Sequence, residues 1–319
     1  MKKRAFSMML IVVLAASLLA GCGGGEKKAV RLATGGESGT YYAIGGVLGT
    51  KLNPLLKKST LTVNTSGASK ANLLSIEDGE TEMAVVQSDT LAYAHEGIQL
   101  FASEGATKKS LWVAGLYNEI VQIVAKKGIN SIEELKGKTV VVGDVGSGTE
   151  FNAAQVLEAY GMTFADINKQ NGSFQQGVDG IIAGNVDAVF TVSGAPTTSI
   201  MSLDATNPGD FDLLSLSKEA IDYLTGKYPF LVYNPMPAGT YSSITHDTEC
   251  VAVQAVLVAS EDLSEDVVYE LTKAMFDNLK SLGEGHDKWK LVTLEGASGN
   301  CVTMHPGALK YYKEVGAVK

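Results

Sequence analysis

Two glycine-rich loops place small hydroxylated residues where helices are expected to begin. The first loop runs from Gly35 to Thr40 and the second from Gly143 to Thr149, and both end in the tripeptide Ser-Gly-Thr. The first turn of a helix carries unpaired backbone N–H groups and a partial positive charge. The two loops therefore predict a binding site for a small anion or zwitterion.

The same loops lack the residues that nucleotide binding or catalysis would need. Tyr41 and Glu150 follow them where a phosphate-binding loop would supply its lysine, and neither loop has the spacing of a dinucleotide fingerprint. Val145 stands where the sharp turn around a nucleophilic Ser147 would require glycine. The four histidines have no second histidine or cysteine at metal-ligand spacing. No catalytic residue, metal site or cofactor is therefore expected.

Basic residues are scarce near the loops. Arg31 is the only arginine beyond residue 4, and it lies in a predicted strand on the far side from the first loop. A carboxylate would then be held by backbone N–H groups, hydroxyls, amides or Lys70 rather than by a guanidinium pair. Tyr41, Tyr42 and Tyr117 could form side walls that are apolar in body and polar at the tip. Because adjacent helical residues point about 100° apart, only one of the first two is expected to reach the site.

Short β-branched runs alternate with helical patterns, which is typical of α/β layering. Strands are predicted at residues 30–33, 61–63, 83–86, 112–116, 121–125, 139–142 and 188–192. Helices are predicted at residues 42–52, 70–76, 150–160 and 175–183. In open α/β sheets, ligands bind beyond the carboxyl ends of the strands, where loops lead into helices.

A second match suggests that the two halves of the chain are built alike. Gly79 is followed by Glu82, a buried strand and Ser88, and Gly184 is followed at the same offsets by Asp187, a strand and a serine at 193. Together with the paired loops, this repeat predicts two α/β lobes that face each other across a cleft.

The N-terminus has the features of a secretory signal. A basic head at residues 2–4 precedes an apolar run at residues 8–19, which is too short to span a bilayer. The small pair before Cys22 resembles a bacterial lipobox, so residues 1–21 are expected to be removed and Cys22 lipidated. The alternative is an ordinary signal with an incidental cysteine. Residues 22–29, rich in glycine and charge, read as a flexible tether.

The composition of the chain limits which kinds of partner it can bind. Without residues 1–21, which carry three positive charges and no negative ones, the formal net charge changes from −9 to −12. An acidic chain has no electrostatic basis for binding nucleic acid or an anionic membrane surface, so the lipid must provide the membrane anchor. Cys250 and Cys301 are the remaining cysteines, and their spacing leaves open whether they form a disulfide. A monomer is expected.

Several stretches resemble the TAXI family, the solute-binding subunits of one branch of TRAP transporters. They are residues 33–46, 87–89, 142–150, 237–241, 263–273 and 305–308, in the family's order and over nearly the whole mature chain. The resemblance implies a type II periplasmic-binding-protein fold and a membrane partner driven by an ion gradient. It also implies ligands such as glutamate, glutamine or 2-oxoglutarate.

The resemblance further implies a set of ligand-binding residues. They are Gly39, Thr40, Tyr41, Ser66, Ser69, Gln87, Ser88, Tyr117, Ser147, Gly148, Thr149 and Ser193. The chain departs from the family pattern at Glu37, Ser38, Ala43 and Lys70. An acidic Glu37 near an anion site would suit a ligand with an ammonium group.

Together these features predict a lipid-anchored solute receptor of the TRAP type. It is expected to capture a small carboxylate by closure of its cleft and not to be an enzyme. Lobe 1 is expected to take residues 30–117 and 262–319, and lobe 2 residues 118–261. Two alternatives are the receptor of an ATP-driven importer, which can share this fold, and a periplasmic enzyme.

Overall fold

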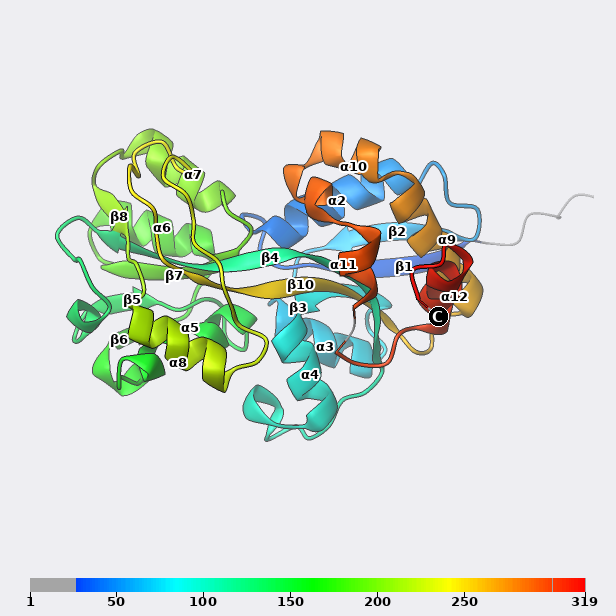
Figure 1. Cartoon of the computed structure of the whole chain (residues 1–319), viewed down its shortest axis with the longest axis horizontal. Coiled ribbons are helices and arrows are strands. Elements are labelled where there is room, and N and C mark those ends of the chain that lie inside the picture. The colour runs from blue at the N-terminus through cyan, green and yellow to red at the C-terminus, as the bar shows by residue number, and fades with distance from the viewer. Residues whose placement is uncertain (1–26, 300, 319) are drawn as a thin grey trace, which may run out of the picture.

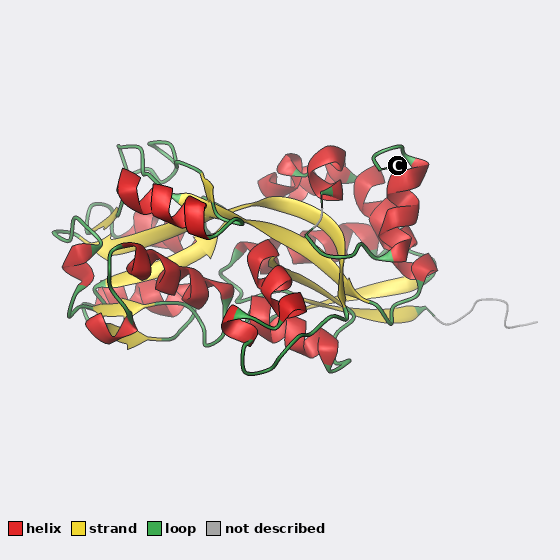
Figure 2. Cartoon of the chain, turned by 60° about the horizontal axis from the view of Figure 1, so that its bottom comes forward, coloured by secondary structure: helices red, strands yellow, loops and turns green. Residues whose placement is uncertain are grey.

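A computed structural model describes residues 27–299 and 301–318 as an elongated α/β protein (Figures 1 and 2). The predicted signal peptide, Cys22 and all but the last residues of the predicted tether lie outside the described residues. Lys28 and Ala29, assigned to the tether from sequence, already belong to the first strand, because they pair with Ser59 and Thr60 of the next strand.

Ten strands form one mixed sheet within the described residues. They are β1 (Lys28–Ala33), β2 (Ser59–Asn64), β3 (Met83–Gln87), β4 (Ser110–Lys126), β5 (Thr139–Val141), β6 (Asn168–Gln170), β7 (Ala188–Ser193), β8 (Phe211–Leu213), β9 (Val232–Tyr233) and β10 (Val251–Ser260). The order is β2-β1-β3-β10-β4-β7-β5-β6, with β8 beside β4 and β9 beside β10.

Parallel pairing at the two ends of the sheet is joined by antiparallel pairing in the middle. Strands β1, β2 and β3 are parallel to one another at one end, and β5, β6 and β7 are parallel at the other. The long strands β4 and β10 run antiparallel between them and connect the two ends of the sheet (Figure 1). We call the part around β1–β3 the first half and the part around β5–β8 the second half.

Strand β4 corrects one sequence prediction. Residues 112–116 and 121–125 were expected to form separate strands, but Ser110–Lys126 is continuous. The segment between the two runs stays in the sheet because Asn118, Glu119 and Ile120 pair with β10, across a register irregularity. All of these residues except Asn118 are buried, which a surface connection would not be.

Helices cover both faces of the sheet (Figure 2). They are α2 (Thr40–Leu52), α3 (Ser69–Glu77), α4 (Ser88–Glu96), α5 (Gly148–Ala159), α6 (Phe174–Ala183), α7 (Thr198–Thr206), α8 (Lys218–Lys227), α9 (Glu265–Asp277), α10 (Leu279–Gly285), α11 (Leu294–Ser298) and α12 (Pro306–Glu314). Short 3-10 turns are η1 (Gln99–Phe101), η2 (Glu133–Leu135), η3 (Phe164–Asp166) and η4 (Asp287–Leu291). The four helices predicted from sequence are all present, and all four begin one or two residues earlier than expected.

The buried side chains form clusters that change partway along the two long strands. One cluster joins residues 30–117 with residues 255–312, whereas two others, one on each face of the second half, draw on residues 120–253. The change falls between Tyr117 and Ile120 in β4 and between Val253 and Ala255 in β10. The lobe boundaries given above remain a prediction. The change in β4 agrees with the predicted boundary after residue 117, whereas the change in β10 lies before the predicted boundary after residue 261.

The repeat read from the sequence has a structural counterpart. Gly79 and Gly184 both have positive φ angles, 75° and 82°, at the ends of α3 and α6. The carboxylates that follow them bind a neighbouring strand in the same way: Glu82 accepts from the Arg31 N–H at 2.8 Å, and Asp187 accepts from the Thr139 N–H at 2.9 Å. Each half therefore uses one carboxylate to fix the strand that leads into its glycine loop.

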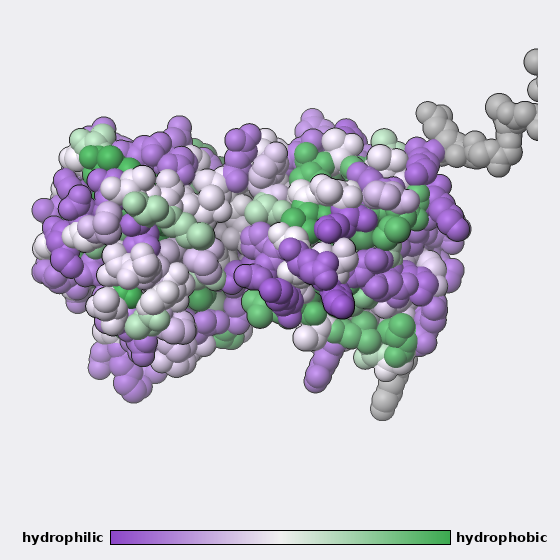
Figure 3. Space-filling view, turned by 90° about the horizontal axis from the view of Figure 1, so that it is seen from above, coloured by the Kyte–Doolittle hydropathy of each residue, from purple (hydrophilic) through white to green (hydrophobic). Residues whose placement is uncertain are grey.

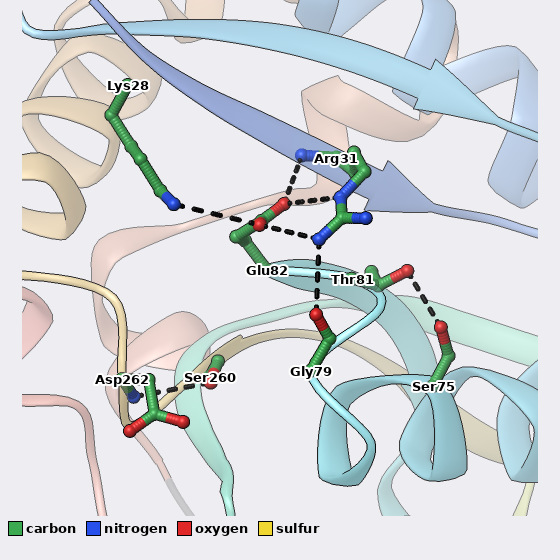
Figure 4. A network of polar contacts seen from close by, with 8 residues as sticks. All are labelled: Lys28, Arg31, Ser75, Gly79, Thr81, Glu82, Ser260 and Asp262. Carbon is green, nitrogen blue, oxygen red and sulfur yellow. Dashed lines mark hydrogen bonds and ion pairs between the residues drawn. The ribbon is translucent and has the colours of Figure 1, made fainter.

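In the first half this carboxylate also binds the Arg31 side chain (Figure 4). Nη2 of Arg31 lies 2.8 Å from Oε1 of Glu82, Nε lies 3.0 Å from Oε2, and Nη2 also donates to the Gly79 carbonyl at 3.2 Å. Burial acts to raise the pKa of Glu82, but the hydrogen bonds and charge of Arg31 together outweigh it and lower that pKa. Arg31 thus holds β1 to the turn that precedes β3.

Glu82→Gln should reduce the free energy of unfolding by about 1 kcal/mol at pH 7, since it removes a partly exposed, two-pronged ion pair. The pKa of Glu82 is lower in the folded state than its usual value of 4.5. The stabilisation is therefore complete above that value and is lost as the pH falls through the lower folded pKa. Urea titrations should show a larger difference at pH 7 than at pH 3. The exposed Glu80→Gln is the control, and an equal loss in that variant would contradict the assignment.

Candidate ligand-binding site

A cavity lies where the two halves meet, beyond the carboxyl ends of β1, β3 and β7. It has a volume of ≈ 40 Å³. One water molecule needs about 10–15 Å³ by this measure, so the cavity has room for a small solute. Its lining residues are Gly35, Gly36, Ser38, Gly39, Thr40, Tyr41, Ala68, Ser69, Gln87, Glu119, Asp144, Ser147, Gly148, Thr149, Ser173, Phe174, Val192 and Ser193.

Nine of the twelve residues expected from the resemblance line this cavity. They are Gly39, Thr40, Tyr41, Ser69, Gln87, Ser147, Gly148, Thr149 and Ser193. They come from segments far apart in the chain, so the fold has gathered what the sequence pattern only suggested. Their role in ligand binding stays a prediction.

The other three lie outside the lining. The Ser66 hydroxyl accepts from the Ala68 N–H at 3.1 Å and so shapes the turn before α3. The Ser88 carbonyl faces the Cys301 thiol at 3.5 Å. Tyr117 is buried on β4, and its hydroxyl has no hydrogen-bond partner among the described residues. Ser66 precedes the lining residues Ala68 and Ser69, and Ser88 follows the lining residue Gln87, but neither of the two serines lines the cavity.

Direct contacts close the cavity. The Thr40 N–H donates to the Ser193 hydroxyl at 3.2 Å, and that hydroxyl donates to Oγ1 of Thr40 at 2.9 Å. The Gln87 amide donates to Asn152 of α5 at 3.1 Å, and Asn152 donates to Asp89 of α4 at 3.2 Å. The two halves therefore touch through hydrogen bonds between buried groups on both sides of the cavity.

Glycine at position 148 permits this close approach. A Cβ atom added there would lie 1.7 Å from Oε1 of Gln87, which is itself held by Asn152. The Phe174 ring similarly packs against Gly39, 3.6 Å from where a Cβ would stand. The small residues of the two loops thus let one half reach the other.

Several helices begin at the cavity wall. The N-cap residues of α2 and α3 are Gly39 and Ala68, and neither provides a side-chain hydrogen bond to its helix. The N-caps of α5 and α6 are Ser147 and Ser173, each of which accepts from one N–H of its own helix. Ala68 has a φ angle of 64°, a region that favours glycine, and it keeps this strained conformation at the site. The wall therefore offers backbone N–H groups and positive helix ends to an anion.

The two Ser-Gly-Thr loops are not equivalent. In the first loop Gly39 is the N-cap and the helix begins at Thr40, whereas in the second Ser147 is the N-cap and the helix begins at Gly148. The Ser147 hydroxyl accepts from the Glu150 N–H at 3.1 Å. The hydroxyl of Ser147 is thus engaged within its own loop, and no hydrogen bond to the Thr149 hydroxyl is found among the described residues.

Two carboxyl groups in the lining were missed from sequence. Glu119 is only 2% exposed and accepts from the Tyr41 hydroxyl at 2.9 Å. Burial raises its pKa well above the usual value, although hydrogen bonds from Tyr41 and Gln87 act in the opposite direction. Asp144 is half-buried in the second glycine loop, and burial raises its pKa too. A lone charged residue inside the apolar run of β4 was the available signal for Glu119.

Two side chains proposed as ligand partners from sequence lie elsewhere. Glu37 is exposed and does not line the cavity, so its suggested role beside an ammonium group is wrong. Lys70 forms an ion pair with Glu104 at 2.9 Å and does not line the cavity either. Glu37 turns outward at the loop surface, and Lys70 is already neutralised.

Cys250 and Cys301, whose pairing was left open, are both free thiols. Cys250 is buried with the core of the second half, whereas Cys301 is exposed near Ser88 in the first half. Burial raises the pKa of Cys250 to about 12 and that of Cys301 to about 11. Neither thiol is set up to react at neutral pH.

Across residues 27–299 and 301–318, no three His, Cys, Asp or Glu side chains gather in a way that could hold a metal ion. In the same part of the chain, no helix combines the length and apolar character needed to cross a membrane.

The model of the NMT1-like family matches residues 32–316, which is most of the chain. The chain belongs to the NMT1-like family. Three solved structures show which fold this family member shares. PhnD1 from Prochlorococcus marinus, in complex with methylphosphonate, has a TM-score of 0.56 and 12% identity, covering 91% of this chain and 99% of its own.

The alkanesulfonate-binding protein SsuA from Xanthomonas axonopodis pv. citri, bound to MOPS, has a TM-score of 0.52 and 15% identity over 91% of this chain and 92% of its own. A putative L-cystine ABC transporter protein from Listeria monocytogenes has a TM-score of 0.50 and 13% identity over 82% of this chain and 95% of its own. At such identities the likeness concerns the fold alone.

The predicted fold class is thereby confirmed for this NMT1-like protein: two α/β lobes of a periplasmic-binding-protein fold with a cleft between them. Two of these structures hold a small acid: SsuA is described as an alkanesulfonate-binding protein bound to MOPS, and PhnD1 is in complex with methylphosphonate. The finer assignment to the TAXI family of TRAP receptors is not confirmed, because the named relatives include a component of an ABC transporter.

Thr149→Val should weaken ligand binding about 10- to 150-fold, because a hydrogen bond to a charged ligand group contributes about 1.5–3 kcal/mol. Thr149 is 5% exposed in the cavity wall, and valine keeps its shape. Thr225→Val on α8 is the matched control, since its hydroxyl only donates to the Ile221 carbonyl of the same helix. Calorimetric affinities that are equal in wild type and Thr149→Val would remove this hydroxyl from the site.

Proposed function

We propose that this protein is an extracytoplasmic solute receptor that captures a small acid between its lobes and delivers it to a membrane importer. The supporting observation is the cavity at the contact of the two lobes, lined by the first residues of α2, α3, α5 and α6. A solute that touches both walls binds the closed form more tightly than the open form, and so stabilises it. No chemical step is needed for this function.

For the ligand, we propose a small carboxylate of the glutamate, glutamine or 2-oxoglutarate type. Helix starts favour one negatively charged group, and the lining offers the Gln87 amide and several hydroxyl groups as hydrogen-bonding partners. Two proteins of the same fold bind acids of another kind. Methylphosphonate is a compact acid, and MOPS carries a sulfonate group. Phosphonates and sulfonates are therefore the second class to test.

For the membrane partner, two readings have separate support. The structural relatives favour an ATP-driven importer, because the Listeria monocytogenes protein is described as part of an ABC transporter. The sequence stretches at residues 33–46 and 142–150 favour a TRAP transporter instead. We place the ATP-driven importer first. A neighbouring gene for a nucleotide-binding subunit would support it, and genes for TRAP membrane subunits would support the other.

A thermal-shift screen of the purified mature protein should show stabilisation by small acids. A ligand at 100 times its dissociation constant adds about 2.7 kcal/mol to the free energy of unfolding. The panel would hold the three carboxylates, methylphosphonate and an alkanesulfonate, with a hexose and a polyamine as controls. Native mass spectrometry of the same sample would reveal a retained solute. Stabilisation by the hexose or polyamine alone would contradict the proposal.

We also propose that the lipid on Cys22 anchors the receptor to the membrane. This residue lies outside the described part of the chain, and the support is the lipobox pattern before it. Cys22→Ala should leave ligand affinity unchanged and move the protein from the membrane fraction to the soluble one. Retention of that variant in washed membranes would refute lipid anchoring but would leave the proposal of solute binding unaffected.

A further inference from the structure

Glu119 stands out among the side chains of the cavity. It lies on β4, is 2% exposed, and reaches the cavity from the strand that links the two lobes. Its hydrogen-bonding neighbours among the described residues are Tyr41, whose hydroxyl donates to Oε2 at 2.9 Å, and the Gln87 side chain. A buried carboxylate with no positive partner is unfavourable, so natural proteins rarely keep one without a use.

The described lining residues offer Glu119 no cation. They include two carboxyl groups and a tyrosine, but no lysine, arginine or histidine. The nearest candidate cations are engaged outside the lining: Lys70 pairs with Glu104 at 2.9 Å, and Lys288 donates to the Ala195 carbonyl at 2.5 Å. An ionised Glu119 would therefore need a positive partner from outside the lining.

The titratable groups around Glu119 are all acidic or neutral. Tyr41 faces it from α2, Tyr117 lies on the same face of β4, and Asp89 of α4 acts on it through its negative charge. Asp144 lines the same cavity from the loop before α5. None of these groups supplies a positive charge to Glu119. The acidic ones also make a negative charge on Glu119 less favourable.

We propose that Glu119 is a specificity-determining residue that selects solutes carrying a protonated amine beside their acid group. This inference rests on the proposed function, because it concerns the same cavity. The starts of α2 and α3 receive the acid group, and the Glu119 carboxylate receives the ammonium group. The Tyr41 hydroxyl holds the carboxylate in place from the other side.

This arrangement separates solutes by charge. In a zwitterion, the acid group meets the positive helix starts and the ammonium group meets the Glu119 carboxylate, so no buried charge is left unpaired. A dicarboxylate, or an amine-free sulfonate or phosphonate, forces Glu119 to keep a proton or to face a like charge. Burial already favours the protonated form in the empty cavity. Capture of an amine should then release that proton, whereas capture of an amine-free acid should not.

The test uses pairs of acids that differ only in the amine. They are L-glutamate and glutarate, L-alanine and propionate, taurine and ethanesulfonate, and 2-aminoethylphosphonate and ethylphosphonate. Affinities are measured by calorimetry for wild type, for Glu119→Gln and for the exposed control Glu37→Gln. We expect wild type to prefer the amine-bearing member of the pair that binds. Glu119→Gln should reduce this preference about 10- to 150-fold, and Glu37→Gln should keep it.

A second measurement works on wild type alone. Titrations at pH 7 in two buffers with different heats of ionisation count the protons released, and we expect release, of up to one proton, for the amine-bearing acid only. Equal or tighter binding of the amine-free acid, or an unchanged preference in a folded Glu119→Gln, would overturn the role of Glu119 while leaving the receptor function intact. Failure of every acid to bind would instead refute the proposed function.

Discussion

The continuity of β4 and β10 is the constraint on which the rest of the structure depends. Both strands run through the two lobes, and they are hydrogen-bonded to each other from Ser110 and Ser260 to Ile120 and Ala252. The lobes can therefore change their relative orientation only by bending a paired ribbon, not by sliding along a loose linker. Such a hinge restricts motion to a few positions and brings the same two walls together each time. On the face that Figure 3 shows, hydrophilic and hydrophobic residues are mixed over both halves.

The chemistry of the cavity follows from that geometry. Strands β1 and β7 end at the same place, so the loops that follow bring helix starts and hydroxyls into one small volume. Helix starts are electropositive, and β4 adds Glu119 between them, which is negative when ionised. Neither feature alone distinguishes an amine-bearing acid from an amine-free one. The distinction comes from their position in the same closed space, where water cannot screen the charges.

Sequence reasoning predicted the glycine loops, the fold class and most of the cavity lining, because these depend on local patterns. Ser-Gly-Thr after a strand is such a pattern, and it led to Thr40 and Thr149. It failed where the signal depends on tertiary contacts. Glu119 was missed because β4 was divided in two, and Glu119 lies in the gap between the divided parts, so it read as part of a connection. Glu37 was chosen for its closeness in sequence to the loop, but that side chain points to solvent. Ser173 and Phe174 belong to a helix start with no glycine loop, so only the fold could bring them to the site.

The contacts that close the cavity differ in kind from the contacts that would hold a solute. Thr40 and Ser193 bind each other, and Asn152 binds Gln87 and Asp89, without any solute between them. These hydrogen bonds stabilise the closed form whatever the cavity contains, and each replaces bonds to water in the open form, so their net effect is small. Glu119 acts in the opposite direction, because closure without a cation forces it either to take up a proton or to keep a charge that has lost its solvent. A receptor must stay open until its solute arrives, and the opposition between these two effects would provide that: closure becomes favourable when a bound ammonium group neutralises Glu119.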